Sequence, residues 1–372
     1  MATITFTGDI LPNKRMNDIL KGDYSVCFKK AKKLKECDYL VGNLETPVAG
    51  EELLYTHQRF CFNTPKGLLS ALKESGFSLL TLANNHCMDR GEQGILNTIK
   101  NCKEYGFDTV GLYSSLEERN KTFIKEIDGI KVAFVNYTYG TNAFVHKTFL
   151  EHDYMVNLLQ PEETKSGSIH LLNSYDKIAE DLKRIYFEKS EEYQLASPYL
   201  ERLRDDIIKA KNEADYVIAV IHNGGQYVEQ IDPYSIFIAE KIKQFGADII
   251  VGNHQHIIQN CDTSDNYLKI FCLGNFLYDN RIENEDCYFD KPLYNAVFHL
   301  SLSRDESGKI IANKSFSIYT TMIDSSGVPV IIDSYDLYKI KSESHLRCDI
   351  LHYANLFAGE EKYTKVQERY EL

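Results

Sequence analysis

Residues 248–256 read DIIVGNHQH, and this stretch indicates both the fold and the place of a site. A short apolar run that stops at a Gly-Asn pair is typical of a buried strand followed by a tight turn. His254 and His256 come directly after that turn, and both imidazoles can enter one pocket if the backbone turns there. Neutral imidazole is the most common metal ligand in proteins. The pair alone also fits a surface loop with two unrelated histidines, so a metal site can be inferred only with support from other parts of the chain.

The same pattern recurs along the chain, because other short apolar runs also stop at turn residues or at a histidine. These runs are Thr3–Thr7, Asp38–Val41, Phe77–Leu82, Lys131–Val135, Tyr216–Ile221 and Lys269–Leu273. Helical patterns stand between them, at Tyr24–Glu36, Pro65–Ser75, Gln93–Tyr105 and Tyr234–Phe245. Strands that alternate with helices of this length predict an α/β fold with parallel sheet. In such sheets ligands bind at the carboxyl ends of the strands.

Polar side chains follow these strand ends, and each is a weak signal by itself. Asp9 is a common turn residue, Asn85 fits a helix cap, and a lone His222 is more often structural. Together they place carboxylates, amides and imidazoles at one edge of the sheet, and the full set is Asp9, Asn43, Glu45, Asn85, His86, His222, His254 and His256. Such a mixed oxygen and nitrogen set suits one or two divalent ions, Mn²⁺, Fe²⁺ or Zn²⁺.

Composition narrows the class of protein. The chain has 372 residues, 43% of them hydrophobic and 26% charged, which excludes a disordered, collagen-like or disulfide-rich chain. Its net charge of −12 makes nucleic acid an unexpected partner. No stretch is apolar enough to span a membrane, no signal peptide is visible, and the nine cysteines are scattered. We therefore expect a cytoplasmic protein, or an extracytoplasmic one from which an export segment was removed.

Two segments stand apart from the alternating pattern. Residues 151–212 are charged and partly helical, which predicts a helical insertion, either a lid or a solvated arm. After residue 300 the pattern turns to strands at Lys309–Thr321 and Val328–Ile332, followed by a charged helical tail over Ser342–Leu372. We expect one domain over residues 1–300, carrying the insertion, and a C-terminal β-hairpin and helical extension over 301–372 packed on it.

The motifs, taken in order, resemble a known family. They are similar to the motifs of the capsule synthesis protein CapA family. In chain order they are Asp9, Asn43-Leu44-Glu45, Leu82-Ala83-Asn84-Asn85-His86 with Asp89 and Gly91, His222, His254-Gln255-His256 and Leu273-Gly274-Asn275-Phe276. This family is also known as the poly-γ-glutamate synthesis protein PgsA and belongs to the calcineurin-like metallophosphoesterases. The resemblance covers about residues 2–300 and implies a four-layer α/β/β/α sandwich.

The resemblance also implies roles for single residues. Asp9 matches the first-strand metal ligand, Glu45 the acidic residue that the family keeps nearby, and Asn85 the amide ligand. His222 and His254 match ligands of one ion, and His256 a ligand of the other. Asn43 stands where the wider superfamily has a bridging aspartate, so a second ion is expected to bind more weakly. His86 matches the histidine that protonates the leaving group or stabilises the phosphoryl transition state. Asn275 is expected to donate a hydrogen bond to substrate, and a turn-capping role fits it equally well.

The leading hypothesis is a metal-dependent hydrolase of phosphoesterase type that acts in capsule or poly-γ-glutamate biosynthesis. Its partners would be an anionic polymer or a phosphorylated small molecule, and capsule synthase subunits. The alternative is a non-catalytic accessory subunit that binds polymer or a synthase partner, because a fold does not by itself imply a function. A third interpretation makes Cys87 a nucleophile and is the weakest of the three. Tyr137, Tyr139, Asn142 and Tyr278 follow strand ends, where a structural role is favoured over one in lining the pocket.

Overall fold

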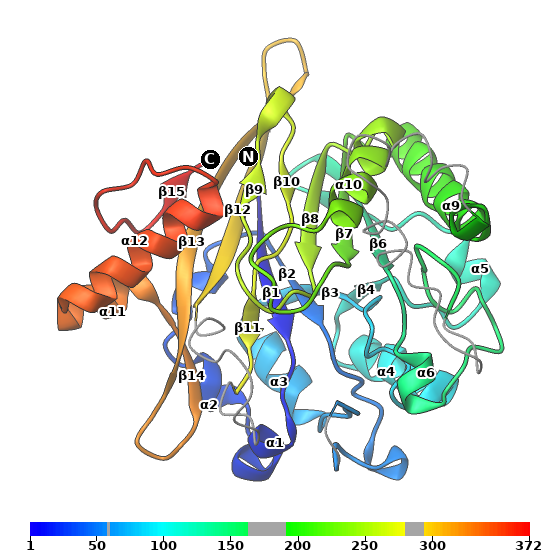
Figure 1. Ribbon diagram of the computed structural model, residues 1–372, viewed down its shortest axis with the longest axis horizontal. Coiled ribbons are helices and arrows are strands. Elements are labelled where there is room, and N and C mark those ends of the chain that lie inside the picture. The colour runs from blue at the N-terminus through cyan, green and yellow to red at the C-terminus, as the bar shows by residue number, and fades with distance from the viewer. Residues whose placement is uncertain (58–59, 163–190, 280–293) are drawn as a thin grey trace.

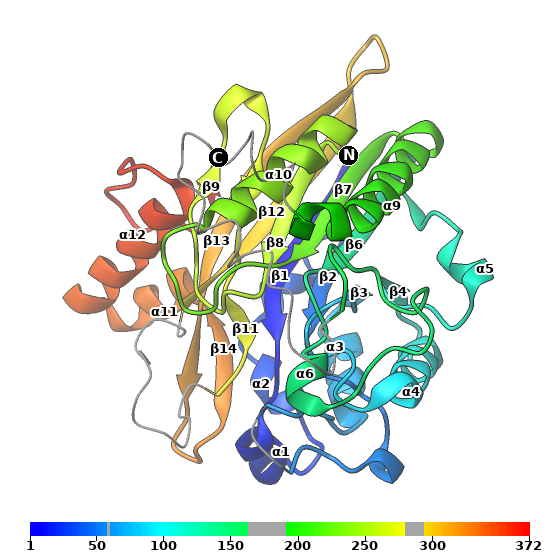
Figure 2. The same ribbon diagram turned by 45° about the vertical axis from the view of Figure 1, so that its right-hand side comes forward.

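The computed structural model describes residues 1–57, 60–162, 191–279 and 294–372. Two β-sheets lie face to face in the middle of the molecule, and helices cover the outer face of each (Figures 1 and 2). The resulting order of layers is helix, sheet, sheet, helix. The α/β sandwich expected from the sequence is therefore confirmed.

The first sheet is mixed. Its central strands β1, β2, β3 and β4 are parallel, whereas β12, β13 and β14 continue the sheet beyond β1 in antiparallel fashion. A short strand, β11, also pairs with β1, and β15 pairs with β13. The strands are β14 (Pro329–Asp333), β13 (Ile310–Ile323), β12 (Tyr294–Arg304), β1 (Ala2–Ile10), β2 (Tyr39–Leu44), β3 (Phe77–Thr81), β4 (Asp108–Val110), β11 (Asn275–Leu277) and β15 (Tyr370–Glu371).

The second sheet has a parallel centre and antiparallel edges. Strands β6, β7, β8 and β10 run in the same direction, as the strand–helix alternation predicts. In order across the sheet the strands are β5 (Ile124–Ile127), β6 (Ile130–Thr138), β7 (Tyr216–His222), β8 (Ile249–Asn253), β10 (Lys269–Ile270) and β9 (Cys261–Asp262).

Alternation along the strands sorts the apolar side chains into three cores. Side chains such as Phe6 and Phe134 meet between the two sheets. The opposite face of the first sheet packs on helices α2, α3 and α4, and that of the second sheet packs on α9 and α10. Successive residues of a strand point to opposite faces, so one strand serves two cores: Val132 lies in the inter-sheet core and Ala133 lies against the helices.

The helices connect the strands and cover the sheets. They are α1 (Lys14–Leu20), α2 (Ser25–Phe28), α3 (Gly67–Glu74), α4 (Gly91–Glu104), α5 (Leu116–Arg119), α6 (Ala143–His146), α9 (Glu191–Glu213), α10 (Pro233–Phe245), α11 (Ser334–Lys341) and α12 (Ser344–Ala358). Short 3₁₀ turns occur at Lys32–Lys35, Glu51–Leu53 and Ser264–Asn266.

Two helical predictions were wrong in part. The segment expected to be one helix over Tyr24–Glu36 is broken into α2 and a 3₁₀ turn, because Lys30 leaves the helix to form a β-bridge with Ile332. The tail expected to be helical contains α12 but ends in β15, where Tyr370 pairs with Phe316 and is fully buried. Tertiary contacts override local helix propensity in both segments.

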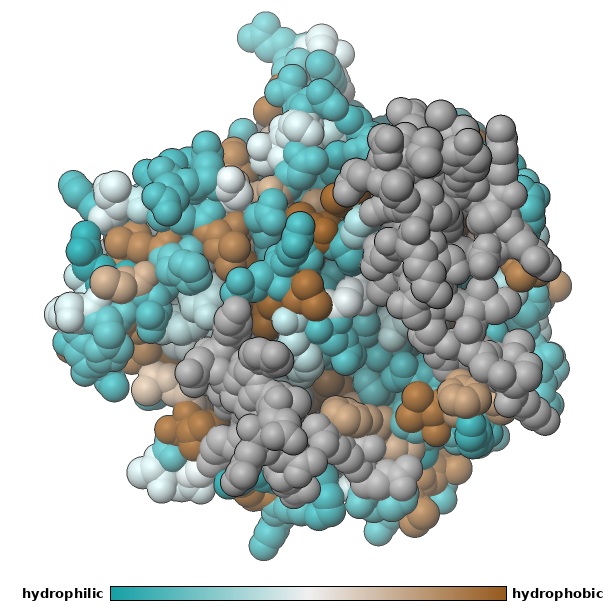
Figure 3. Space-filling view, in the orientation of Figure 1, coloured by the Kyte–Doolittle hydropathy of each residue, from teal (hydrophilic) through white to brown (hydrophobic). Residues whose placement is uncertain are grey.

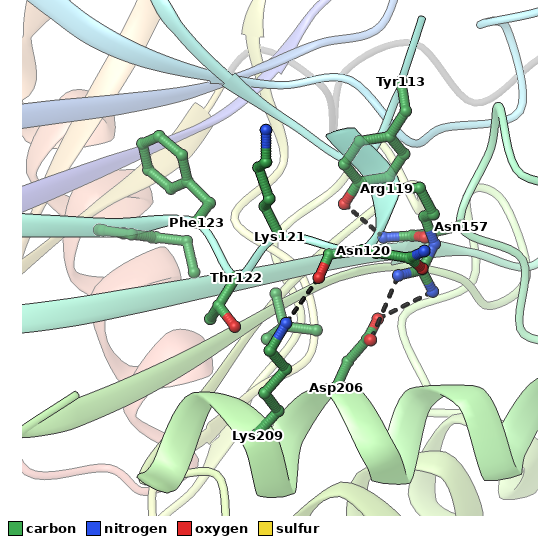
Figure 4. A pocket seen from close by; sticks show the side chains of 11 residues that line it. Tyr113, Arg119, Asn120, Lys121, Thr122, Phe123, Asn157, Asp206 and Lys209 are labelled. Atoms are coloured by element: carbon green, nitrogen blue, oxygen red, sulfur yellow. Dashed lines mark hydrogen bonds and ion pairs between the residues drawn. The ribbon is translucent and has the colours of Figure 1, made fainter. Parts of the chain in front are cut away.

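The expected insertion is described only in part, since residues 163–190 lie outside the described residues. Helix α9 packs on the second sheet, and its residue Asp206 forms an ion pair with Arg119 at the end of α5, with nitrogen and oxygen 2.9 Å apart (Figure 4). The Tyr137 hydroxyl also donates to Asp206, at 2.6 Å. The cavity at this junction measures about 20 Å³, which is room for about one water molecule. It is a structural junction and too small for a substrate.

The C-terminal strands continue the first sheet. Strand β12 runs across the expected boundary at residue 300 and pairs with β1 on one side and β13 on the other. The division into a domain and an extension stays a prediction. Helix α12 closes this end of the inter-sheet core, where the Phe357 and Phe316 ring centroids are 4.7 Å apart, and apolar side chains surface beside α12 (Figure 3).

Candidate metal centre

The carboxyl ends of strands from both sheets meet at one place. Asp9 lies near the end of β1, Asn43 is its partner in β2, and His222 ends β7 opposite Asn253 of β8. Two glycines allow the backbones to approach: a Cβ on Gly8 would lie 1.8 Å from the Gly274 carbonyl oxygen, and one on Gly252 would lie 2.0 Å from that of Phe271. Only glycine fits at such distances. The close packing brings β11, and with it Asn275, beside Asp9.

His222 is the meeting point of one half of the site. Its Nε2 lies 2.8 Å from Asn85 Oδ1, 3.1 Å from His254 Nδ1 and 3.3 Å from Glu45 Oε1. Its Nδ1 accepts a hydrogen bond from the Asn43 amide at 3.2 Å, which places the ring proton on Nε2. Three potential ligand atoms therefore surround one ring proton, and a divalent ion can take the place of that proton.

Asp9 and His256 form the other half. Asp9 Oδ2 accepts from the backbone N–H of His254 at 3.2 Å and lies 3.3 Å from His256 Nδ1. The same Nδ1 donates to Asn275 Oδ1 at 2.9 Å. Because Asn275 is the first residue of β11, the pairing of β11 with β1 sets the orientation of the His256 ring.

Glu45 lies between the two halves. Its Oε1 is 3.3 Å from His222 Nε2 and 3.8 Å from His256 Nε2. Neither carboxylate oxygen has a hydrogen-bond partner among the described residues, although the side chain is fully buried. Glu45 also belongs to both groups of donors that lie within 4.8 Å of one another here, Asp9-Glu45-His222 and Glu45-His254-His256. A buried carboxylate with no hydrogen bond is costly unless a positive group compensates its charge.

The pKa shifts of the site residues indicate that the site favours a positive charge. Burial acts to raise the pKa of Asp9, but the hydrogen bond from His256 and the nearby His222 outweigh it, so the pKa is lowered. Burial acts to lower the pKa of His256, but Glu45 and Asp9 raise it to about 9. Burial and the neighbouring His222 hold the pKa of His254 well below its usual value. His254 is therefore neutral near pH 7, the protonation state that binds metal.

The backbone of the HQH segment is strained. His254 has φ of 110° and His256 has φ of 61°. Non-glycine residues at positive φ are uncommon, and they cluster at functional sites where the surrounding structure maintains them. Both histidines follow directly after β8, so this strained turn aims two imidazoles from one strand end into the same site.

The two remaining amides are oriented by their neighbours. Asn43 Nδ2 donates to Asp9 Oδ1 at 2.7 Å, while its Oδ1 accepts from the Thr81 hydroxyl at 3.3 Å. Metal ligation through Oδ1 of Asn43 therefore requires the amide to turn by half a rotation. Asn275 Nδ2 is buried without a hydrogen-bond partner among the described residues, which leaves a donor for a ligand.

His86 lies beside these donors, in the loop after β3. Its Nδ1 donates to Asp89 Oδ2 at 2.9 Å, and the proximity of this ring contributes to the low pKa of His254. Asp89 also lies 3.3 Å from Nε2 of His146, at the end of α6. From the sequence, Asp89 was named only as part of the family motif around His86, and His146 was missed. The sequence signal that could have identified His146 was a histidine shortly after the predicted strand Lys131–Val135.

Aromatic rings pack around the histidines. Tyr139 lies 4.7 Å from His254 and Phe62 lies 4.6 Å from His86, measured between ring centroids. Tyr278 stacks on His256 at 6.5 Å. Tyr137 points instead into the core beside α9 and takes no part in the site. Cys87 is buried, which raises the pKa of its thiol and keeps it protonated, a state unsuited to a nucleophile.

Comparison with known proteins identifies the family of this chain. The sequence model for the bacterial capsule synthesis protein PGA_cap matches residues 3–280, which include every residue of the candidate centre. The chain belongs to this capsule synthesis protein family. The chain is also similar to the capsule biosynthesis protein CapA of Bacillus anthracis, with 28% identity over 282 residues, 74% of this chain and 60% of the relative. The PGA biosynthesis protein CapA of Bacillus subtilis (strain 168) is 24% identical over 279 residues, 74% of this chain and 63% of the relative.

The PGA_cap-family chain is shorter than these relatives and spans about 60% of the length of each. Among the described residues, no helix has the length and apolar character needed to cross a membrane. The family and the names of the relatives connect the chain with capsule biosynthesis. They name no ion and no reaction.

Proposed function

We propose that this PGA_cap-family chain is a metal-dependent hydrolase of phosphoesterase type that acts in capsule or poly-γ-glutamate biosynthesis. The observation that carries the proposal is Glu45, a fully buried carboxylate without a hydrogen bond among the described residues, surrounded by Asp9 and three histidines. Folding such a group without a compensating positive charge is unfavourable, and the pKa of His256, raised to about 9 beside Glu45 and Asp9, reflects that demand for positive charge. A divalent ion, Mn²⁺, Fe²⁺ or Zn²⁺, supplies that charge, and the donor set fits these ions.

The distances support two ions that share Glu45. One position is surrounded by His222, His254 and Asn85. His222 Nε2 lies 2.8 Å from Asn85 Oδ1 and 3.1 Å from His254 Nδ1. Asp9 and His256, 3.3 Å apart, are grouped around another. Glu45 faces both groups and would provide the carboxylate that Asn43, as an amide, lacks. Asn43 then holds Asp9 and His222 in place through its two hydrogen bonds.

The chain's own residues have distinct tasks in this scheme. When bound, the ions supply Lewis-acid activation of water and of a phosphoryl oxygen. His86, oriented by its hydrogen bond to Asp89, donates a proton to the leaving group. Asn275 offers its unpartnered Nδ2 to a substrate oxygen. The buried donors exclude bulk water, because the side chains of Asp9 and Glu45 are 0% exposed.

The substrate follows from the family and from the chemistry. The names of the relatives refer to capsule and PGA, so we propose an anionic polymer or a phosphorylated small molecule as substrate, with capsule synthase subunits as partners. Bound ions dominate the local field, so the chain's net charge of −12 does not prevent an anion from binding.

The test combines metal analysis with an assay on an aryl phosphate in the presence of Mn²⁺. His254→Ala is expected to lose bound metal and activity together. His86→Ala is expected to keep the metal of the main centre, whose ligands it does not change, and to lose activity. Activity that survives both substitutions overturns the mechanism.

One observation favours the alternative of a non-catalytic accessory subunit. Asn43 turns an amide N–H, and no carboxylate, toward Asp9 and His222, which reduces the negative charge available to a second ion. In that case one ion is structural, and the chain binds polymer or a synthase partner. Metal content without hydrolysis, together with tight polymer binding, identifies this function.

A further inference from the structure

A separate group of buried donors lies beside the candidate metal centre. It consists of His86, Asp89 and His146, whose potential ligand atoms lie within 4.8 Å of one another. The side chains of His86, Asp89 and His146 are 4%, 0% and 6% exposed. His86 and Asp89 come from the loop after β3, and His146 ends α6, so the fold brings the group together from two segments.

Half of the Asp89 carboxylate is left without a hydrogen bond. Its Oδ2 accepts from the backbone N–H of Phe62 at 2.6 Å and from His86 Nδ1 at 2.9 Å. Its Oδ1 and His146 Nε2 are 3.3 Å apart, yet neither atom makes a hydrogen bond among the described residues. The contact is close enough for an ion pair but is not aligned as a hydrogen bond. Buried polar atoms are rarely left in this way unless another group lies between them.

No lysine or arginine in the described part of the chain compensates the charge of Asp89, whose ion-pair contacts are to His86 and His146. Arg90 is the next residue, but its guanidinium donates to the carbonyl oxygens of Leu54, Asp89 and Cys61 and to the Cys61 sulfur. The carboxylate is thus buried between two imidazoles without a permanent positive charge.

We propose that Asp89, His146 and His86 bind a divalent transition-metal ion of the zinc class, separate from the ions at the main centre. Ligand atoms of a tetrahedral ion with bonds of about 2.0 Å lie about 3.3 Å apart, which matches the separation of Asp89 Oδ1 and His146 Nε2. His86 Nδ1 supplies the third ligand. Two imidazoles, one carboxylate and an open fourth position make up a common zinc donor set.

The ion has a consequence for His86. A cation on Nδ1 replaces the proton that is now shared with Asp89, so the remaining ring proton stays on Nε2 and the ring is kept as a hydrogen-bond donor. This consequence rests on the proposed function, in which His86 donates a proton. The cation site itself does not rest on it.

The test measures bound zinc without an activity assay. The full chain is stripped with a chelator, loaded with Zn²⁺, desalted and analysed for metal per chain. His146→Ala is expected to bind about one equivalent less than the unmodified chain. His254→Ala, which disrupts the main centre, is expected to keep the equivalent that depends on His146. The matched control is His345→Ala, a histidine whose side chain is 73% exposed, and it is expected to bind as much as the unmodified chain.

An anomalous difference map of the unmodified zinc-loaded chain gives a second readout that needs no variant. A peak about 2.0–2.2 Å from both Asp89 Oδ1 and His146 Nε2 supports the site. Density at the main centre with none between these two atoms overturns this inference and leaves the proposed function standing. Equal zinc content in His146→Ala and in the unmodified chain also overturns it. Zinc between Asp89 and His146 with none at the main centre supports it and overturns the proposed function.

Discussion

Replacing Glu45 by glutamine should remove most of the stability that metal gives to this chain. Glutamine keeps the size of the side chain and one oxygen but loses the charge. Because Glu45 lies between the two halves of the main centre, 3.3 Å from His222 and 3.8 Å from His256, the substitution weakens both ions. His222 lies in one of the two halves, so His222→Ala should weaken one ion and keep a part of the effect.

The magnitude follows from linkage and from the size of the chain. An ion present at 100 times its Kd stabilises the folded state by about 2.7 kcal/mol. Unfolding entropy of about 2.1 cal/mol/K per residue gives about 0.8 kcal/mol/K for 372 residues. Each ion should therefore raise Tm by about 3–4 °C, and two ions by about 7 °C.

The assay is a pair of thermal melts for each chain, one in chelator and one in Mn²⁺ at the stated excess. The difference between the two melts cancels any effect of the substitution on the metal-free fold. Glu45→Gln should shift by less than about 2 °C, His222→Ala by about half of the full effect, and the exposed control Glu306→Gln by the full amount. A Glu45→Gln chain that shifts as much as the unmodified chain would refute the bridging role of Glu45.

Three other results are expected. His86→Ala should lower kcat about 100- to 10,000-fold without loss of metal from the main centre, as expected for a general acid, whereas Cys87→Ser should keep its activity; equal losses in an aryl phosphate assay would contradict this assignment. Burial lowers the pKa of His299 to about 3, so only the unfolded state takes up its proton below pH 6.5. In urea titrations with chelator, His299 should therefore lower the free energy of unfolding by about 1.4 kcal/mol per pH unit from about pH 6.5 down to about pH 3. His299→Gln should remove that contribution, and the same dependence of the unfolding free energy on pH in both chains would contradict it. Gly8→Ala places a Cβ 1.8 Å from a carbonyl oxygen and should cost roughly 3 kcal/mol or more, while Gly140→Ala, with open space around its Cβ, should cost less than about 1 kcal/mol; similar urea midpoints for the two would contradict the close approach.

Much of the fold could be read along the chain, because strands and turns are local. The apolar run before Gly252 and the alternation of strands with helices predict β8 and parallel sheet, whereas the division into two sheets was implied only by the family resemblance. The break after α2 could not be predicted, since it depends on a bridge between Lys30 and Ile332, 302 positions along the chain. The final strand β15 depends in the same way on burial of Tyr370 against a distant strand.

For the site, the sequence by itself determined which donors follow strand ends, because a turn after an apolar run is a local property of a few residues. Only the tertiary structure decided which donors face one another. It left Glu45 without a hydrogen bond between two groups of ligands, turned the amide nitrogen of Asn43 toward Asp9, and placed His146 against Asp89. These contacts join residues far apart in the chain, and they depend on how closely the sheets approach and on how each side chain is rotated, neither of which is encoded in spacing along the sequence.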